Sequence, residues 1–294
     1  MEITGETKVC CVIGDPIEHT LSPLMHNAAF KHLKLDFVYV AFRVRSEELK
    51  NAVKGMRSLG VHGFNVTMPH KNAITKYLDS LDSTVQFIES VNTVLNDGGK
   101  LIGFNTDGVG ALKAFKENQV PLDGKKLLLL GAGGAARAIA FQLASEVEKL
   151  TILNRDGEKA KQLAKVLKEK FGKKIVGDTL SASAIKNYLK DADILVNATS
   201  VGMHPNTEQT LVNREWLKPD MAVMDIVYNP IETRLIKDAK AVGAKVVYGT
   251  EMLFFQGAAS FEIWFKRPAP VEVMREAILR SITHGGNASV EESS

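Results

Sequence analysis

The sequence predicts an α/β protein of two domains, and three observations lead to this fold class. The chain has 294 residues, which corresponds to about two domains at roughly 150 residues each. Short β-branched runs alternate with amphipathic segments, as strands and helices do in α/β folds. The run GAGGAA at 131–136 directly follows an apolar run, as in a tight turn between a strand and a helix. We therefore expect a first domain with a mixed sheet and a second domain with a doubly wound parallel sheet.

In the first domain, five elements are predicted before the first long turn: strands at 9–13, 37–42 and 63–68, and helices at 23–33 and 46–59. Ser46 is the predicted N-cap of the second helix. Pro69 is predicted as the first residue of a further helix, because proline loses no needed donor at that position. Segments 90–95 and 101–105 flank the turn 96–99 (NDGG), which predicts a β-hairpin because these residues tolerate positive φ.

The pattern changes near residue 108, where we place a domain boundary, and strands and helices then alternate regularly. The predicted strands are 127–130, 150–153, 194–197, 221–225 and 245–247, and the predicted helices are 108–118, 135–144, 158–171 and 232–241. The segment 249–281 is predicted to be helical with a break at 268–270 (PAP), which proline causes. The polar tail 284–294 is predicted to be disordered.

Composition and charge exclude several classes of function. Hydrophobic residues make up 45% and charged residues 24% of the chain, which is ordinary for a soluble globular protein. The net charge of +3 is too small to indicate a nucleic-acid-binding protein. The only cysteines, Cys10 and Cys11, are adjacent, which is a pattern of reducing compartments. Because bilayer-spanning runs and a signal-peptide layout are both missing from the sequence, we expect a cytoplasmic protein that binds neither nucleic acid nor membrane.

Residues 131–136 fit the G-x-G-x-x-G/A dinucleotide pattern, with Ala136 in the small third position. Gly131 permits the tight turn, and Gly133 lets the backbone approach a pyrophosphate. The helix that follows offers free N–H groups and the positive end of its dipole. Strand, glycines and helix are in register, which favours dinucleotide binding over a merely flexible turn. The expected cofactor-binding residues of this loop are Gly131, Ala132, Gly133, Gly134 and Ala135.

The end of the next strand indicates which dinucleotide binds. It reads Asn154-Arg155-Asp156, with Lys159 one turn into the following helix. The planar guanidinium of Arg155 suits a 2′-phosphate, and Lys159 adds a point charge, which favours NADP over NAD. Asp156 would repel that phosphate unless it caps the helix, so the use of NAD stays open.

A second set of polar residues lies at strand ends in the first domain, where open sheets bind ligands. It consists of short hydroxyls and amides with one lysine and one aspartate, which suits a small polyhydroxylated acid. Taken singly, each residue also fits a turn, a cap or an exposed position. The set is Thr20, Ser22, Asn65, Thr67, Lys71, Asn92, Asn105, Thr106 and Asp107. Cys and His spacings give no indication of a metal site.

Short motifs follow one another along the chain in the order IGDP, HTLSP, NVTMPHK, VNT, NTDG, GAGGAA, NR, NATS, DIVY and QGA. In this combination and order the sequence resembles the shikimate dehydrogenase family over residues 9–265. The resemblance implies an oxidoreductase acting on a CH–OH group. Such an enzyme carries out the reversible NADPH-dependent reduction of 3-dehydroshikimate to shikimate, in the pathway to chorismate and the aromatic amino acids. Hydride transfer across a cleft between two α/β domains is implied as well.

The resemblance also implies roles for single residues. Lys71 and Asp107 match the catalytic pair, in which the lysine stabilises and protonates the developing oxyanion and the aspartate holds its ammonium. The implied substrate-binding residues are Thr20 and Ser22 at the carboxylate, Asn65, Thr67, Asn92, Asp107 and Gln256 at the hydroxyls, Tyr228 near the carboxylate and the nicotinamide, and Lys71 itself. The implied nicotinamide side consists of Thr199, Ser200, Gly249 and Met252. The family does not use His19 or His70 as the base, so both are expected to be structural.

Because Gln256 has to meet the substrate, the C-terminal helices are predicted to return to the first domain. The predicted domains are then 1–107 with 250–294 for the substrate, and 108–249, a Rossmann-type domain, for NADP. The excess of basic residues lies in 108–249, which is weak support for an anionic ligand, because lysines on helix faces explain much of it.

Three alternatives stay open. A quinate/shikimate dehydrogenase that uses NAD shares these motifs. A methylenetetrahydrofolate dehydrogenase shares the two-domain layout and a lysine, but would need an aromatic residue to stack on its pterin. A non-catalytic NADP-binding sensor belongs to a different class, and the presence of both Lys71 and Asp107 argues against it. The expected partner is a small-molecule substrate, and a homodimer stays open because the family contains monomers and dimers.

Overall fold

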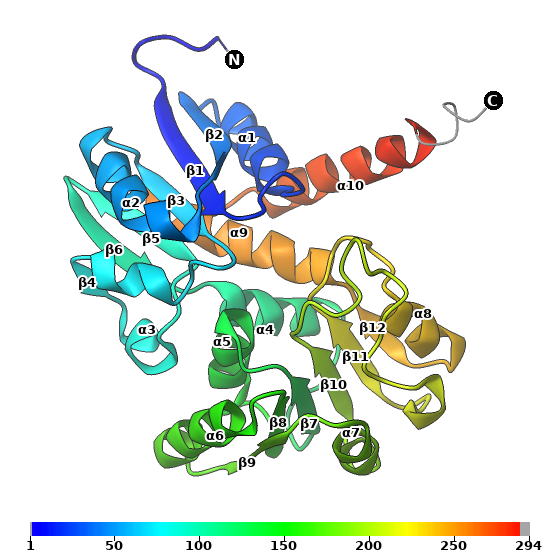
Figure 1. Ribbon diagram of the computed structural model, residues 1–294. Coiled ribbons are helices and arrows are strands. Elements are labelled where there is room, and N and C mark those ends of the chain that lie inside the picture. Colours follow the sequence, from blue (N-terminus) through cyan, green and yellow to red (C-terminus); the bar gives the residue numbers. More distant parts are fainter. Residues whose placement is uncertain (1, 289–294) are drawn as a thin grey trace. The chain divides into compact units, whose positions relative to one another are not determined.

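The computed structural model describes residues 2–288, which form two compact units (Figure 1). The first unit contains the residues up to Thr106 and those from Gly257 on, so it is discontinuous in sequence. The second unit runs from Asp107 to Gln256. Each unit is built on a six-stranded sheet, which confirms the predicted two-domain α/β class. Among the described residues, helices that are both long and apolar enough to cross a membrane are not found.

The first unit has a mixed sheet, as predicted. Its elements are β1 (Lys8–Gly14), α1 (Ser22–His32), β2 (Phe37–Arg43), α2 (Leu49–Ser58), β3 (Gly63–Val66), β4 (Ser80–Leu81), α3 (Ser83–Ile88), β5 (Thr93–Asp97), β6 (Lys100–Phe104), the part of α9 (Gly249–Phe265) from Gly257 on, and α10 (Val271–Ala288). The strand order is β2-β1-β3-β5-β6-β4. Strands β1, β2 and β3 are parallel, whereas β5 is antiparallel to both β3 and β6. The predicted hairpin is confirmed, with Gly98 and Gly99 at positive φ in its turn.

Two predicted helix starts in this unit are wrong. Ser46 is the first residue of a short 3₁₀ helix, η1 (Ser46–Glu48), for which Arg45 holds the cap position, and α2 begins only at Leu49. Pro69 lies in a turn, and the next helical segment is a 3₁₀ helix, η2 (Ala73–Tyr77). The reason at Pro69 is a tertiary contact: the neighbouring His70 is buried, and its Nε2 lies 2.6 Å from the Val44 carbonyl oxygen.

The C-terminal segment is more regular than predicted. The break at 268–270 is confirmed, since α9 ends at Phe265 and α10 begins at Val271. However, α10 continues to Ala288, so residues 284–288 of the predicted disordered tail are helical. The remainder of that tail, 289–294, lies outside the described residues.

His26 lies in the core of the first unit with no solvent exposure. Its ring stacks on Tyr39, with centroids 4.4 Å apart, and lies 5.3 Å from the ring of Trp264. Within the described part of the chain, neither ring nitrogen has a hydrogen-bond partner. Burial therefore lowers the pKa of His26 from its ordinary 6.5 to about 3, because an imidazolium here would lose its hydration without a partner.

We expect His26→Phe to make the protein resist acid better than the wild type. A base whose folded pKa is depressed binds more protons in the unfolded state, so its contribution to stability is present above pH 6.5 and is lost as pH falls towards 3. Phenylalanine keeps the stacking and does not titrate. The difference in free energy of unfolding between variant and wild type should grow by about 1.4 kcal/mol per pH unit below pH 6.5. Urea unfolding at matched neutral and acidic pH measures it, and a difference independent of pH would contradict the assignment.

The second unit is a parallel α/β domain. Its elements are α4 (Asp107–Glu117), β7 (Lys126–Leu130), α5 (Gly134–Leu143), β8 (Lys149–Asn154), α6 (Gly157–Phe171), β9 (Lys174–Thr179), α7 (Ala182–Leu189), β10 (Ile194–Asn197), η3 (Arg214–Trp216), β11 (Ala222–Asp225), α8 (Arg234–Ala241), β12 (Lys245–Val247) and the start of α9. Every strand pair is parallel, in the order β12-β11-β10-β7-β8-β9. Counted from β7, this is the 3-2-1-4-5-6 order of Rossmann-type sheets, in which ligands bind beyond the carboxyl ends of the strands. The predicted Rossmann-type domain is confirmed, although β9 and α7 were not predicted.

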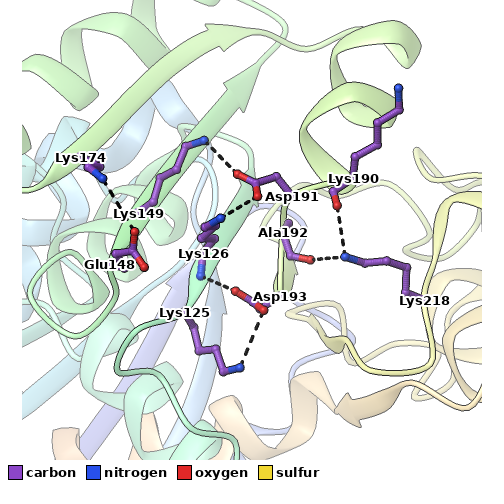
Figure 2. Close-up of polar contacts among 10 residues, drawn as sticks. All are labelled: Lys125, Lys126, Glu148, Lys149, Lys174, Lys190, Asp191, Ala192, Asp193 and Lys218. Carbon is purple, nitrogen blue, oxygen red and sulfur yellow. Dashed lines mark hydrogen bonds and ion pairs between the residues drawn. The ribbon is translucent and has the colours of Figure 1, made fainter.

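Several lysines of the second unit lie at the amino ends of its strands, where Figure 2 shows Lys125, Lys126, Lys149 and Lys174 paired with acidic side chains. The Lys126 backbone N–H donates to Asp193 Oδ2 at 2.8 Å, and its Nζ lies 2.6 Å from Asp191 Oδ1. Lys149 reaches the same Asp191 at 3.5 Å, and Lys218 donates to the Ala192 carbonyl at 3.0 Å. This edge is opposite the glycine loop, which follows the carboxyl end of β7. These basic residues therefore join strand ends, and their charge is not evidence for cofactor binding.

Candidate active site

Three of the predicted polar residues of the first unit, Asn65, Asn92 and Thr106, lie together at one end of the strands of the mixed sheet. Asn65 stands opposite Thr93 in the β3–β5 pair, and Thr93 stands opposite Phe104 in the β5–β6 pair. The end of β3, the start of β5 and the end of β6 therefore share an edge, which brings Asn65 together with Asn92 and Thr106. The sheet topology thus does what the strand-end argument predicts.

The polar side chains at this edge hold one another in place. Asn65 Nδ2 donates to the Asn92 carbonyl and to Ser260 Oγ, both at 3.0 Å. Ser260 Oγ lies 2.8 Å from Thr93 Oγ1. The Asn92 carboxamide makes two hydrogen bonds with Thr106. The Thr106 N–H donates to Asn92 Oδ1 at 2.8 Å, and Asn92 Nδ2 donates to Thr106 Oγ1 at 2.9 Å. All five residues are at most 6% exposed. Their mutual hydrogen bonds hold them in a fixed arrangement before any ligand binds. We call these five residues, Asn65, Asn92, Thr93, Thr106 and Ser260, the polar row.

The loop after β1 supplies two more hydroxyls. Thr20 Oγ1 donates to Ser22 Oγ at 3.3 Å and accepts from the Ser22 N–H at 3.3 Å. Ser22 is the first residue of α1 and is 7% exposed. Paired hydroxyls at a helix N-terminus suit a carboxylate, which accepts hydrogen bonds and is favoured by the helix dipole.

Thr67 and Lys71, both half-buried, follow β3. The Thr67 N–H donates to the Ile13 carbonyl at 2.9 Å, which ties this segment to β1. The Lys71 carbonyl accepts the Val91 N–H at 2.8 Å, which ties the lysine's main chain to the residues just before Asn92. The backbone thus places the predicted proton donor on the segment that borders the polar row.

The two histidines inside the motifs differ in their surroundings. His70 is buried and bonded to the Val44 carbonyl, as expected of a structural residue. His19 is exposed. The structural role predicted for His19 stays a prediction.

In the second unit, the loop 131–136 has the geometry that a dinucleotide needs. Gly131 has a φ of +113°, and a Cβ there would lie 2.8 Å from the Ala198 carbonyl oxygen, so only glycine fits. A Cβ on Gly133 would meet no atom within 4 Å, so the approach to the N-terminus of α5 is open. Ala136 is fully buried, as the close packing of helix on strand requires.

Two basic side chains, Arg155 and Lys159, lie at and after the end of β8, and only Lys159 is paired with an acidic residue among the described residues. Asp156 caps α6, accepting the Lys159 N–H at 3.4 Å, and its other oxygen pairs with Lys159 Nζ at 3.6 Å. Asn154 Nδ2 donates to the Asp156 carbonyl at 3.0 Å. The capping alternative for Asp156 is therefore confirmed. Arg155 is exposed and, among the described residues, has no hydrogen bond or ion pair.

A buried carboxyl group supports the loops that follow β10 and β11. Asp225 has no solvent exposure and accepts hydrogen bonds from Asn197 Nδ2 (2.9 Å), the Val227 N–H (3.1 Å) and the Thr233 hydroxyl (2.7 Å). Burial raises its pKa to about 6, although these hydrogen bonds favour the ionised form. Asn197 in turn accepts from Thr199 Oγ1 at 2.7 Å. The Thr199 N–H also donates to Asn197 Oδ1, at 3.2 Å, so both the hydroxyl and the backbone N–H of Thr199 are engaged inside the protein.

The other predicted residues of the second unit lie near its ends or on its surface. Asp107 is the first residue of α4 and is 4% exposed. Gln256 is the last residue of the unit, and its Nε2 donates to the Leu253 carbonyl at 3.0 Å. Ser200 is exposed and Tyr228 half-buried, whereas Met252 is buried. A Cβ on Gly249 would press against the carbonyls of Ile226 and Val227, so the start of α9 requires glycine.

Sequence reasoning missed two residues of the polar row, Thr93 and Ser260, and a third residue, Tyr39, that contacts it. Thr93 and Ser260 hydrogen-bond with Asn65, and Tyr39 Oη donates to Asn65 Oδ1 at 2.7 Å. Asn65 and Ser260 are 195 residues apart in sequence, so local patterns do not connect them. Thr93 lies next to the predicted Asn92, and this adjacency is the one signal that could have found it.

Three family models match the chain. They are the shikimate dehydrogenase substrate binding domain at 12–94, shikimate/quinate 5-dehydrogenase at 113–236, and the shikimate 5′-dehydrogenase C-terminal domain at 249–279. A shikimate dehydrogenase (NADP(+)) of Methanocaldococcus jannaschii is 48% identical over 282 residues, which are 96% of this chain and 99% of that protein. The chain belongs to the shikimate dehydrogenase family.

Solved structures agree. A crystal structure of a shikimate dehydrogenase in complex with NADP⁺ has a TM-score of 0.89 and 46% identity, covering 96% of this chain and 98% of that one. The shikimate 5-dehydrogenase of Thermus thermophilus, in complex with NADP(H) and shikimate, has a TM-score of 0.81 and 37% identity, covering 93% of this chain and 99% of that one. The family resemblance of the motifs is thereby confirmed.

Proposed function

We infer that the protein is an NADP-dependent shikimate dehydrogenase, an oxidoreductase that interconverts 3-dehydroshikimate and shikimate. The observation that carries this conclusion is the 48% identity, over 96% of the chain, to a shikimate dehydrogenase (NADP(+)). The two sites give it a chemical basis. The first unit offers buried hydroxyls and amides for a polyhydroxylated acid, and the second offers an open glycine loop and an exposed arginine for a phosphorylated dinucleotide.

The residues present fit NADP. Positive φ at Gly131, open space at Gly133 and the N-terminus of α5 suit a pyrophosphate. The guanidinium of Arg155 suits the 2′-phosphate, and Lys159 adds positive charge beside it. Thr199, Ser200, Gly249 and Met252 are proposed to border the nicotinamide. When bound, NADPH supplies the hydride.

Lys71 is the proposed proton carrier. A ketone that accepts a hydride at carbon develops negative charge on its oxygen, so a nearby ammonium both stabilises that charge and supplies the proton. In the reverse direction the neutral amine takes the proton from the shikimate hydroxyl. Asp107, the proposed partner of Lys71, would hold the ammonium and accept a hydrogen bond from the substrate. Their pairing stays a prediction.

The remaining residues are proposed to orient the substrate. Thr20 and Ser22 would bind its carboxylate, with Tyr228 near it. Asn65, Thr67, Asn92 and Gln256 would bind its hydroxyls. In this assignment the second unit binds NADP, and the substrate is bound by the first unit together with Asp107, Tyr228 and Gln256 of the second. We also propose that the protein works in the cytoplasm, where Cys10 and Cys11, both unbridged and buried, stay thiols. A homodimer stays a prediction.

One alternative function has support of its own. The model that matches 113–236 covers both shikimate and quinate dehydrogenases, and quinate differs from shikimate in its ring and not in its carboxylate. The capping role of Asp156 disfavours NAD as the cofactor, because the carboxylate is turned to the helix and to Lys159.

A spectrophotometric assay of the purified protein tests the function. Formation of the reduced cofactor is followed with shikimate or quinate as the substrate and NADP⁺ or NAD⁺ as the cofactor. We expect kcat/KM to be highest for shikimate with NADP⁺. Efficient quinate oxidation with a preference for NAD⁺ would favour the alternative, and absence of turnover with every pair would favour a non-catalytic NADP-binding protein.

A further inference from the structure

Tyr39 is a buried tyrosine at the edge strand β2, and its phenol contacts two of the proposed substrate-binding residues. Its side chain is 1% exposed. Its hydroxyl donates to Asn65 Oδ1 at 2.7 Å, and the phenol also interacts with the Ser22 side chain. One phenol therefore joins the residue proposed for the substrate carboxylate to a residue proposed for its hydroxyls.

The ring of Tyr39 is fixed independently of its hydroxyl. β2 is an edge strand, and on its unpaired side the Tyr39 main chain makes two hydrogen bonds with the Asn27 side chain. The Tyr39 N–H donates to Asn27 Oδ1 at 2.8 Å, and Asn27 Nδ2 donates to the Tyr39 carbonyl at 2.9 Å. Its ring stacks on His26 at 4.4 Å with an interplanar angle of 13°. Removing the hydroxyl alone would leave both the hydrogen bonds with Asn27 and the stacking on His26 in place.

The direction of the hydrogen bonds decides how Asn65 presents its carboxamide. An amide oxygen can only accept, so the phenol proton of Tyr39 goes to Asn65 Oδ1. Asn65 Nδ2 then has to face Asn92 and Ser260, its other partners. The Asn92 carbonyl can only accept, so it keeps Nδ2 on its side even without Tyr39. Without the donor at Tyr39, however, the buried Oδ1 of Asn65 loses this partner, and the carboxamide is held less firmly.

We propose that Tyr39 is a positioning residue that holds the Asn65 carboxamide in place in the substrate site through its hydrogen bond to Oδ1. The proposal rests on the proposed function, because it assigns the consequence to shikimate binding. NADP is assigned to the other unit, so the binding of the dinucleotide should not depend on Tyr39.

The test is Tyr39→Phe, which removes one hydroxyl. We expect the KM for shikimate to rise about fivefold to tenfold, the equivalent of one hydrogen bond. The KM for NADP⁺ should stay the same, and kcat should change by less than about twofold, because hydroxyl recognition is lost without loss of the proton carrier. A merely structural role would change both KM values or the amount of active enzyme.

The control is Tyr188→Phe, in the second unit. It also removes a tyrosine hydroxyl with an acceptor, here Asp178 at 3.1 Å, and it should leave the KM for shikimate unchanged. A double-mutant cycle with Asn65→Ala then tests whether Tyr39 acts through Asn65. In the Asn65→Ala background, Tyr39→Phe should have no further effect on the KM for shikimate.

An unchanged KM in Tyr39→Phe would overturn the proposal, and so would an equal rise with and without Asn65. If Tyr39→Phe does not fold, 4-aminophenylalanine at position 39 keeps an N–H donor toward Asn65. A near-wild-type KM for shikimate would then support the proposal, and a rise of about fivefold or more would overturn it. If the wild-type protein does not oxidise shikimate, the proposed function fails and this inference fails with it. If the wild type is active and Tyr39→Phe is silent, only this inference fails.

Discussion

Lys71→Ala should lower kcat for shikimate oxidation by about 10²- to 10⁴-fold, the range of a lost general acid or base. The affinity for shikimate should change much less, because the hydroxyls and amides of the polar row remain. Steady-state kinetics measure the first quantity, and titration of shikimate against the inactive variant measures the second. Retention of full activity would refute the role of Lys71.

Two further variants separate chemistry from placement. Lys71→Met keeps the apolar stem of the side chain and lacks only the terminal amine and its charge, so it should be as inactive as Lys71→Ala. Added methylamine should restore part of the activity of Lys71→Ala, because it supplies an ammonium where the side chain ended. Rescue of Lys71→Ala without rescue of Lys71→Met, which fills the space, would assign the loss to the missing amine.

The role of Asp107 can be read from the same kinetics. If the carboxylate only holds the Lys71 ammonium, Asp107→Asn should have little effect in the Lys71→Ala background. If it also binds a substrate hydroxyl, the double variant should have a higher KM for shikimate than Lys71→Ala alone. These outcomes distinguish the two functions that the family resemblance assigns to Asp107.

The sequence predicts the second unit best, because its signals are local. Each strand of β7, β8, β10 and β11 is a short, nearly fully buried run, and GAGGAA marks the turn between the first strand and its helix. β9 escapes prediction because it is an edge strand in which a single apolar residue, Ile175, is buried. A strand with one side exposed lacks the continuous apolar run that reveals its neighbours.

The candidate site is predictable only where its residues fall inside motifs. Asn65, Asn92 and Ser22 do so, whereas Tyr39 looks like one more residue of an apolar strand. Its importance depends on a partner 26 residues away and on the pairing of β1 with both β2 and β3. The wrong start at Pro69 has a similar origin, since the contact of His70 with Val44 outweighs the local preference of proline for a first helical turn.

Arg155→Ala should raise the KM for NADP⁺ by roughly 10- to 100-fold, the equivalent of a hydrogen-bonded pair with a charged group. The KM for NAD⁺ should hardly change, because only NADP⁺ carries the 2′-phosphate that the guanidinium would bind. For Arg155→Lys, the KM for NADP⁺ should lie between those of the wild type and Arg155→Ala, since an ammonium keeps the charge but loses the two parallel hydrogen bonds. The measurement is kcat/KM for each cofactor at saturating shikimate.

Lys159→Ala is the matched comparison, because Lys159 is already paired with Asp156 at 3.6 Å whereas Arg155 is exposed without such a pair among the described residues. We expect a smaller rise in the KM for NADP⁺ than for Arg155→Ala. Asp156→Ala should have two opposing effects: it removes a negative charge near the phosphate and also the N-cap of α6. If Arg155→Ala weakens NADP⁺ and NAD⁺ equally, the guanidinium only packs at the end of β8, and the selection of NADP lies elsewhere in the second unit.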